Sequence, residues 1–345
     1  MKNTIIGVDL AKDVIQGCIY TNKRVHSNKE MTHKEFLLWL FNTKPTTIIF
    51  EACGTSNYWK QKALEAGHEA RLISAKLVAT VRQNQKTDKN DALAIVQAAQ
   101  LPEIRFIKGK NAEQQQLQSV QRIRDLAMKQ KSALNSQLKA LLLEFNIRVS
   151  SKQGGLKGVI ESVLEDADNG FSSEFRQVLE SAWKQYIQTL ESIRVYDECL
   201  ESSVKEHTDC QRLLKLEGVG TLNAISLYIM RGCADSGIFK KGKDASACIG
   251  LTPLQYSSGG KTKLGSIGKH VKNVPLRSQL ISGAMSFIQQ VEKREAVTKK
   301  EAWVKGLIER KGKKCAAVAL ANKTVRTAFA MLTQGTEYKA ELLVA

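Results

Sequence analysis

Residues 5–12 read IIGVDLAK, an apolar run that reaches a carboxylate at Asp9. Its β-branched residues predict a strand over Ile5 to Asp9. A second apolar run, TTIIFE at residues 46–51, also predicts a strand and ends in the carboxylate Glu51. If the two strands are neighbours, both acids lie at one edge of a sheet. Open α/β sheets bind their ligands just beyond the carboxyl ends of the strands.

The segments around these two strands alternate between strand and helix patterns. Strands are expected at 13–20, 24–27 and 69–73, and helices at 34–41, at 58–66 and again from about residue 74. The first three strands are expected to form hairpins. This order predicts an α/β layer architecture with a mixed sheet.

Two long helical patterns follow. In each, apolar residues recur at steps of three and four, which is typical of an amphipathic helix. The stripes are Leu117, Val120, Ile123, Ala127, Leu134, Leu138 and Leu141, and then Leu179, Trp183, Tyr186, Leu190, Ile193, Leu200 and Val204. They indicate either helix packing within one chain or a coiled-coil-like dimerisation arm. The stretch at about 146–173, rich in Gly and Ser, is interpreted as a connector.

The third region, from residue 208, is expected to be mostly α-helical. It opens with LLKLEGVGTLNAISL, in which Gly218-Val219-Gly220 separates two apolar helices. The turn resembles a helix-hairpin-helix element, whose glycines let backbone N–H groups approach a DNA phosphate. A tight corner between packed helices is the alternative.

The chain is strongly basic. Lys and Arg number 52 against 34 Asp and Glu, a formal net charge of +18, which favours nucleic acid as the partner. No apolar run approaches the roughly 20 residues needed to span a bilayer. The seven cysteines are scattered without a CxxC pair, which argues against a disulfide framework or a zinc site. We therefore expect a cytoplasmic protein, associated with the nucleoid when active.

Two further carboxylates stand in KTDKNDALAIVQAA. Asp88 and Asp91 are three residues apart at the start of a helical pattern, so they share a face. Four carboxylates that converge repel one another unless a cation lies between them. Their hard oxygens suit Mg²⁺, and two such ions can clamp a phosphodiester. We interpret Asp9, Glu51, Asp88 and Asp91 as a metal-binding and catalytic set. A solvated first-turn acid or a simple strand end is the alternative for any one of them.

These motifs carry a family resemblance. IIGVDLAK, FEACGTSNYW and KTDKNDALA, in this order, resemble the N-terminal domain of the DEDD-type transposases of bacterial insertion sequences, the insertion-sequence family one-ten. The resemblance resumes in GVGTLNAISL, in CIGLTPLQYSSGGKTKLGSIGKHVKNVPLRSQLI and in ERKGKKCAAVALANKTVRTAFAML. It implies a RuvC-like (RNase H-like) α/β domain at 1–108, a helical region at 109–207 and a C-terminal transposase domain at 208–345.

The resemblance also implies roles for the SSGGK stretch. Ser258 matches the family's nucleophilic serine, which would attack a DNA phosphodiester and form a covalent phosphoserine link. Local positive charge comes from Lys261, Lys263, Lys269, Lys272 and Arg277, which we take with Gly218 and Gly220 as candidate nucleic-acid contacts. Without the resemblance, the stretch is typical of a flexible loop. Tyr256 is the rival nucleophile, and His270 is interpreted as a phosphate contact or bystander.

The family resemblance also implies nucleic-acid and protein partners for this chain. The family recombines double-stranded donor and target DNA, guided by a structured noncoding RNA that the element encodes, called a bridge RNA. Holding two DNA sites together implies at least a homodimer, and in the synapse a tetramer. One alternative is a Mg²⁺-dependent, structure-selective endonuclease that hydrolyses DNA with no covalent intermediate. Another is a nucleic-acid-binding protein with a decayed nuclease fold, against which the presence of all four acids argues.

Overall fold

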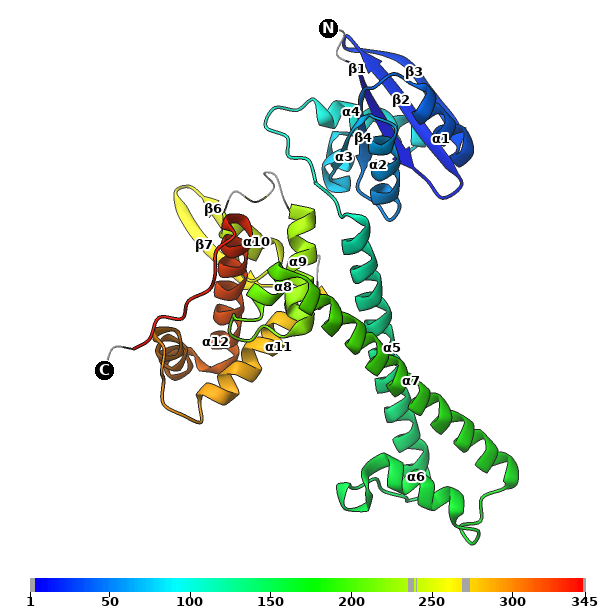
Figure 1. Ribbon diagram of the computed structural model, residues 1–345, viewed down its shortest axis with the longest axis vertical. Helices are drawn as coiled ribbons and strands as arrows, with labels where there is room; N and C mark the ends of the chain where they lie inside the picture. Colours follow the sequence, from blue (N-terminus) through cyan, green and yellow to red (C-terminus); the bar gives the residue numbers. More distant parts are fainter. Residues whose placement is uncertain (1–3, 235–238, 240, 269–273, 344–345) are drawn as a thin grey trace. The chain divides into compact units, whose positions relative to one another are not determined.

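The computed structural model describes residues 4–234, 239, 241–268 and 274–343 of the 345-residue chain (Figure 1). By its internal contacts the chain divides into two compact units. One comprises Met1–Gln115 together with Arg212–Ala345, and the other is Gln116–Gln211. The division into three domains that we expect from the sequence stays a prediction. No helix in the described part of the chain is long and apolar enough to cross a membrane.

The N-terminal segment forms a mixed five-stranded sheet in the order β3-β2-β1-β4-β5. Strands β1, β2 and β3 pair antiparallel, whereas β4 is parallel to both β1 and β5. The mixed sheet is therefore confirmed. The strands are β1 (Thr4–Leu10), β2 (Val14–Thr21), β3 (Arg24–Thr32), β4 (Thr47–Glu51) and β5 (Glu69–Ile73). The helices are α1 (His33–Asn42), α2 (Ser56–Glu65), α3 (Ala75–Val81) and α4 (Asp88–Ala99).

Helices cover both faces of this sheet. On one face, Ile6, Val8 and Phe50 pack against apolar residues of α1 and α2 such as Phe36 and Trp59. On the other face the alternate strand residues meet α3 and α4, in a core made by Ile5, Ile49, Val78, Ala94 and Ile95. Because side chains alternate along a strand, the residues at odd positions of β1 and β4 face α4. Asp9 and Glu51 are among them.

Small residues let α4 lie close to β1. A Cβ placed on Gly7 would stand 2.5 Å from the carbonyl oxygen of Ala92 and 2.6 Å from a methyl group of Val96. Next to it, Cys18 of β2 is fully buried against Ala92 and Val96. Only a glycine fits at position 7, so the approach of α4 to the sheet is fixed by this residue.

The second unit is helical. It is built from α5 (Ala112–Glu144), a 3₁₀ turn (Ser151–Gln153), α6 (Gly155–Glu165) and α7 (Ser173–Glu206). An apolar cluster joins the end of α5 to α6 and to the start of α7, with Leu138, Leu142, Ile160, Leu179 and Trp183 buried in it. The stretch interpreted as a connector thus contains a helix. Its apolar positions Leu156, Val159, Ile160 and Val163 have helical spacing, which the Gly and Ser content obscured.

The two long stripes are only partly buried. Arg124 of α5 forms an ion pair with Asp197 of α7, and Ile193, Leu200 and Val204 are buried as expected. Ile123, which the stripe includes, is half exposed, as are Leu126, Val178 and Val195. Packing within the chain therefore accounts for part of the pattern and leaves several large apolar side chains in solvent.

The C-terminal segment is mostly helical, as expected, but it also contains a β-hairpin that the sequence analysis did not predict. The helices are α8 (Thr208–Leu213), α9 (Thr221–Ala234), α10 (Gly242–Cys248), α11 (Val274–Val291) and α12 (Lys299–Gln334). The hairpin consists of β6 (Pro253–Ser258) and β7 (Lys261–Ile267). Helix α12 is kinked at Gly312, whose φ of 78° is not helical.

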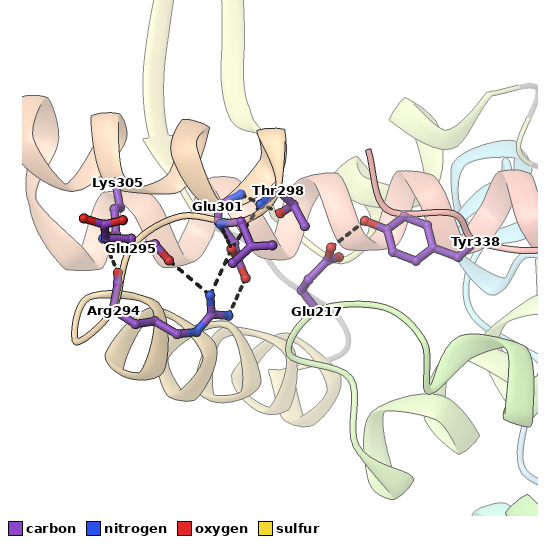
Figure 2. A network of polar contacts seen from close by, with 8 residues as sticks. Glu217, Arg294, Glu295, Thr298, Glu301, Lys305 and Tyr338 are labelled. Atoms are coloured by element: carbon purple, nitrogen blue, oxygen red, sulfur yellow. Dashed lines mark hydrogen bonds and ion pairs between the residues drawn. The ribbon is translucent and has the colours of Figure 1, made fainter. Parts of the chain in front are cut away.

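A network of ionic contacts holds the C-terminal helices together (Figure 2). Glu217, in the turn between α8 and α9, accepts hydrogen bonds from Lys300 at 2.6 Å and from the hydroxyl of Tyr338. Glu301 is buried and accepts from Arg294 and from the amide of Val297, and these hydrogen bonds lower its pKa. The contacts fix the α8–α9 turn and the α11–α12 connection to the first turn of α12.

We predict that Gly7→Ala disturbs α4 more than a matched glycine substitution on the neighbouring strand. The new methyl group must displace the backbone of α4, and overpacking of this kind costs about 1–3 kcal/mol. Amide hydrogen exchange of the full chain, read by mass spectrometry, should show faster exchange in α4. The control is Gly17→Ala, whose methyl group meets only the flexible end of Met31. Equal protection of α4 in both variants would contradict the assigned role of Gly7.

Candidate active site

Asp9 and Glu51 lie side by side at the carboxyl ends of two parallel strands. The register of β1 and β4 pairs Val8 with Phe50, so the two acids follow one residue later on adjacent strands. Both are half-buried, and both are on the face of the sheet that α4 covers. The neighbouring strands expected from the sequence are thus present, and they bring these two carboxylates together.

Helix α4 adds Asp88 and Asp91. The side chain of Thr87 caps the helix by accepting from the amide of Asn90, which places both acids in the first turn. Asp91 is buried and Asp88 is exposed. From the sheet, Asn28 of β3 donates to the carbonyl of Lys89 at 2.9 Å, and buried Gln16 donates to Asn28 at 2.6 Å. These hydrogen bonds hold the start of α4 against β2 and β3.

The pKa values of two of these carboxyl groups respond to burial and to the neighbouring acids. Burial raises the pKa of Asp9, and the negative charges of Asp91 and Asp88 raise it further. The pKa of Glu51 is raised by burial and then by Asp9 and Asp91. Each shift means that the ionised form is disfavoured where it stands. Asp9 therefore experiences repulsion from Asp88 and Asp91, and Glu51 from Asp9 and Asp91. The metal-binding and catalytic role of the four acids stays a prediction.

Two cations from the segment before α4 partly neutralise this repulsion. Arg82 donates to Asp91 at 2.7 Å, and the ammonium of Lys86 lies 3.7 Å from the other oxygen of the same carboxylate. Both cations also lower the pKa of Glu51. Sequence reasoning missed Arg82, although it stands only six residues before Asp88 and supplies the nearest positive charge to the cluster.

The four acids suit a hard divalent cation by their chemistry, because every donor is a carboxylate oxygen. As the side chains stand, however, no group of three or more acidic, His or Cys side chains in the described residues has the geometry of a metal site. Asp91 is directed at Arg82. The residues that would bind Mg²⁺ are Asp9, Glu51, Asp88 and Asp91. Asp91 would have to give up its hydrogen bond from Arg82 to do so.

Ser258 lies at the tip of the β6–β7 hairpin. Gly259 and Gly260 form the two-residue turn with φ of 56° and 75°, the left-handed conformation that favours glycine. The register pairs Ser258 with Lys261 and Tyr256 with Lys263, while Ser257 pairs with Thr262. Because side chains alternate, Ser258 shares a face of the hairpin with both lysines and Ser257 is on the other face. The hairpin is exposed along nearly all its length.

The other proposed nucleic-acid contacts have varied environments. Gly218 has φ of 73°, and its Cβ position is blocked by the backbone of Gly283 in α11, so close packing already requires a glycine there. Gly220 faces open space. Arg277 donates to the carbonyl of Gly250 and packs on Gly268, which ties the base of the hairpin to α11. Lys269, Lys272 and His270 lie outside the described residues.

Comparison with known proteins identifies relatives along nearly the whole chain. Residues 6–147 match the transposase family designated DEDD_Tnp_IS110, and residues 210–299 match the transposase IS116/IS110/IS902 family. The chain is 35% identical to the transposase for insertion sequence element IS1111A of Coxiella burnetii, over 97% of this chain and 91% of that protein. It is 31% identical to a probable family 20 transposase of Pseudomonas aeruginosa, over 97% and 98% of the two chains. A putative transposase of Sinorhizobium fredii is also 31% identical, over 97% and 85%.

We predict that Asp9→Asn stabilises the protein when divalent metal is absent. The raised pKa of Asp9 means that ionising this group opposes folding at pH 7. The variant should therefore melt at a higher temperature than the wild type at neutral pH. The difference should disappear below about pH 3.8, the ordinary pKa of the group, where Asp9 is protonated in the folded and the unfolded chain.

With added Mg²⁺ the wild type should melt at a higher temperature than Asp9→Asn. Mg²⁺ should raise the melting temperature of the wild type and leave that of Asp9→Asn unchanged. The control is Asp13→Asn, which removes an exposed carboxylate from the turn between β1 and β2. Identical melting of the wild type and Asp9→Asn at pH 7, with and without Mg²⁺, would show that the acids neither repel one another nor hold metal.

Proposed function

This chain belongs to the IS110 family of insertion-sequence transposases, and we propose that it cuts and rejoins DNA through a covalent link to Ser258. A transposase acts on DNA, which agrees with the net charge of +18. The observation that carries the proposal is the register of the β6–β7 hairpin. It places Ser258 on the face that carries both lysines and Ser257 on the other face. Tyr256 shares the face of Ser258, and the family resemblance favours the serine over it.

In the proposed reaction, the Ser258 oxygen attacks a phosphorus atom of the DNA backbone. One P–O bond forms to the serine as the P–O bond to a sugar oxygen breaks. The serine loses its proton and the departing sugar oxygen gains one. Because the phosphodiester is kept, a sugar hydroxyl of another strand can later displace the serine and reseal the DNA without ATP. Lys261 and Lys263 offset the negative charge that develops on the phosphoryl oxygens.

We assign the carboxylate set to metal binding in the same reaction. Mg²⁺ held by these acids would supply Lewis-acid stabilisation of the leaving or attacking oxygen. The support is the mutual electrostatic interaction of Asp9, Glu51, Asp88 and Asp91 and their all-oxygen donor set. The acids and Ser258 would form one composite site, supplied by a single chain or by different copies of it.

Guidance by a bridge RNA and assembly into dimers and tetramers complete the proposal. Guidance rests on the family resemblance, and the basic excess is compatible with holding RNA as well as DNA. Assembly is supported by the large apolar side chains that α5 and α7 leave in solvent, among them Ile123, Leu126, Val178 and Val195.

A second candidate function is hydrolysis of branched DNA by the carboxylate set alone. The observation in its favour is that all four acids belong to the N-terminal segment and interact with one another there. Hydrolysis by these acids would not need Ser258. In that case water would be the nucleophile and the hairpin would only bind DNA. The two functions differ in whether a covalent protein–DNA species forms.

We predict that a covalent adduct forms and depends on Ser258. The full chain is incubated with Mg²⁺, its flanking RNA and end-labelled donor and target DNA, and is then denatured in detergent. The wild type should retain labelled DNA. Ser258→Ala should lose the adduct by at least about 10³-fold, as expected for removal of a nucleophile.

The matched controls are the two neighbouring hydroxyls. Ser257→Ala removes a hydroxyl from the opposite face of the hairpin, and Tyr256→Phe removes the rival nucleophile. Both should form the adduct at rates within a few fold of the wild type, whereas Asp9→Ala should form none. Cleavage that proceeds without an adduct in Ser258→Ala, but is lost in Asp9→Ala, would replace this proposal with the hydrolytic one.

A further inference from the structure

A pocket of about 1070 Å³ lies in the C-terminal segment, apart from the hairpin tip that carries Ser258. Its walls come from the start of α10, from Trp303 near the start of α12, from the part of α12 after Gly312, from Leu251 and from Ile267 at the end of β7. The volume lies just above the range of about 300–1,000 Å³ that is common for ligand sites. None of the residues assigned to the carboxylate set or to the serine lines it.

The wall between α10 and α12 is held by close packing and hydrogen bonds. Gly242 lies so close to α12 that a Cβ there would stand 3.0 Å from the Cα of Arg326. Asn322 donates to the carbonyl of Leu251 at 2.9 Å, and buried Ser246 donates to the carbonyls of Gly242 and Asn322. The pocket is therefore formed before any ligand arrives.

Five cations line this pocket, and none of them forms an ion pair with a described residue. They are Lys241, Lys243, Lys314, Lys323 and Arg326. Two other cations of α12 have carboxylate partners: Lys299 pairs with Glu341, and Lys313 pairs with Glu292. The pocket thus gathers five cations that have no described carboxylate partner, which favours an anionic ligand with several charges.

The pocket also has an aromatic and apolar side. Trp303 lines it, and the ammonium of Lys323 stands over the ring, 4.7 Å from its centroid. Leu251, Val318 and Ile267 add apolar surface. Trp303 and the basic residues are separated in the sequence and only the fold places them together. A flat ring beside several cations offers both a stacking surface and phosphate contacts, the combination that binds unpaired nucleotides.

We propose that this pocket binds an unpaired nucleotide of a nucleic-acid strand. Its base lies against Trp303 and the apolar wall, and its phosphates lie among the lysines and Arg326. A base that stacks on Trp303 displaces the ammonium of Lys323, which then pairs with a phosphate. The proposal goes beyond the chemistry at Ser258 and depends on the proposed function only in that the partner is nucleic acid.

The test measures binding to single-stranded oligonucleotides that contain one 2-aminopurine, in separate DNA and RNA arms. The protein is the full chain carrying Ser258→Ala, so the result is independent of cleavage. We expect the fluorescence of 2-aminopurine to be quenched on binding, because its base stacks. Trp303→Ala should weaken binding roughly tenfold or more and abolish the quench, and Trp303→Phe should restore most of both.

The charges are tested with Lys323→Gln/Arg326→Gln. Losing two phosphate contacts should lower the slope of log affinity against log salt by about 1.4, since each contact to a single strand contributes about 0.7. The matched control is Lys299→Gln/Lys313→Gln, which removes two charges from the same helix that carboxylates already neutralise. Its salt slope should equal that of the parent protein.

A second readout uses the parent protein alone, so it does not depend on the folding of any variant. An oligonucleotide with 5-iodouracil is cross-linked by light, and the modified peptide is identified by mass spectrometry. A cross-link at or beside Trp303 is expected, and the arm that gives it identifies DNA or RNA as the ligand. Cross-links confined to other regions, or equal salt slopes in the two double variants, would overturn the proposal. Adduct formation at Ser258 would stand unaffected by either outcome.

Discussion

The close contact between α4 and the central strand of the sheet is the constraint on which the candidate site depends. Gly7 removes the side chain that would keep the helix away, and the first turn of α4 then carries Asp91 against Asp9 and Glu51. The cost of this arrangement is that burial, and then repulsion from neighbouring carboxylates, raises the pKa of Asp9 and of Glu51. Arg82 and Lys86 offset part of it at Asp91. A site that is short of positive charge is suited to taking up a divalent cation together with a phosphodiester.

The candidate nucleophile of the C-terminal segment lies on an exposed hairpin, so its position depends on what holds that hairpin. Rigidity comes from the base of the hairpin and not from its tip. Arg277 ties Gly250 and Gly268 to α11, while Lys300 of α12 and Tyr338 both contact Glu217 in the α8–α9 turn. Figure 2 shows the contact between Glu217 and Tyr338. An exposed tip on a firm base is compatible with a serine that must reach a phosphodiester held elsewhere. The unpaired cations around Trp303 give the same segment a separate surface for nucleic acid.

Much of the N-terminal architecture follows from local sequence. The apolar runs that end at Asp9 and Glu51 predict the strands, and the spacing of Asp88 and Asp91 predicts their common helix face. The β6–β7 hairpin and helix α6 were missed because Gly and Ser dominated the interpretation. Gly259-Gly260 between alternating residues is a hairpin signal, and the spacing from Leu156 to Val163 is helical. The partnership of Arg82 with Asp91 and the gathering of lysines around Trp303 depend on tertiary packing, which no local pattern encodes.

In the proposed mechanism, metal bound by the carboxylates acts on the same phosphate that Ser258 attacks. The most direct measurement replaces one non-bridging oxygen of that phosphate by sulfur and follows adduct formation in Mg²⁺ and in Mn²⁺. Sulfur is a soft ligand that Mg²⁺ binds poorly, whereas Mn²⁺ accepts it more readily. The account predicts slow adduct formation with one sulfur isomer in Mg²⁺ and recovery in Mn²⁺, with no recovery in Asp9→Ala. Equal rates for oxygen and both sulfur isomers in Mg²⁺ would contradict it, because the metal would then not touch the phosphate at which the serine reacts.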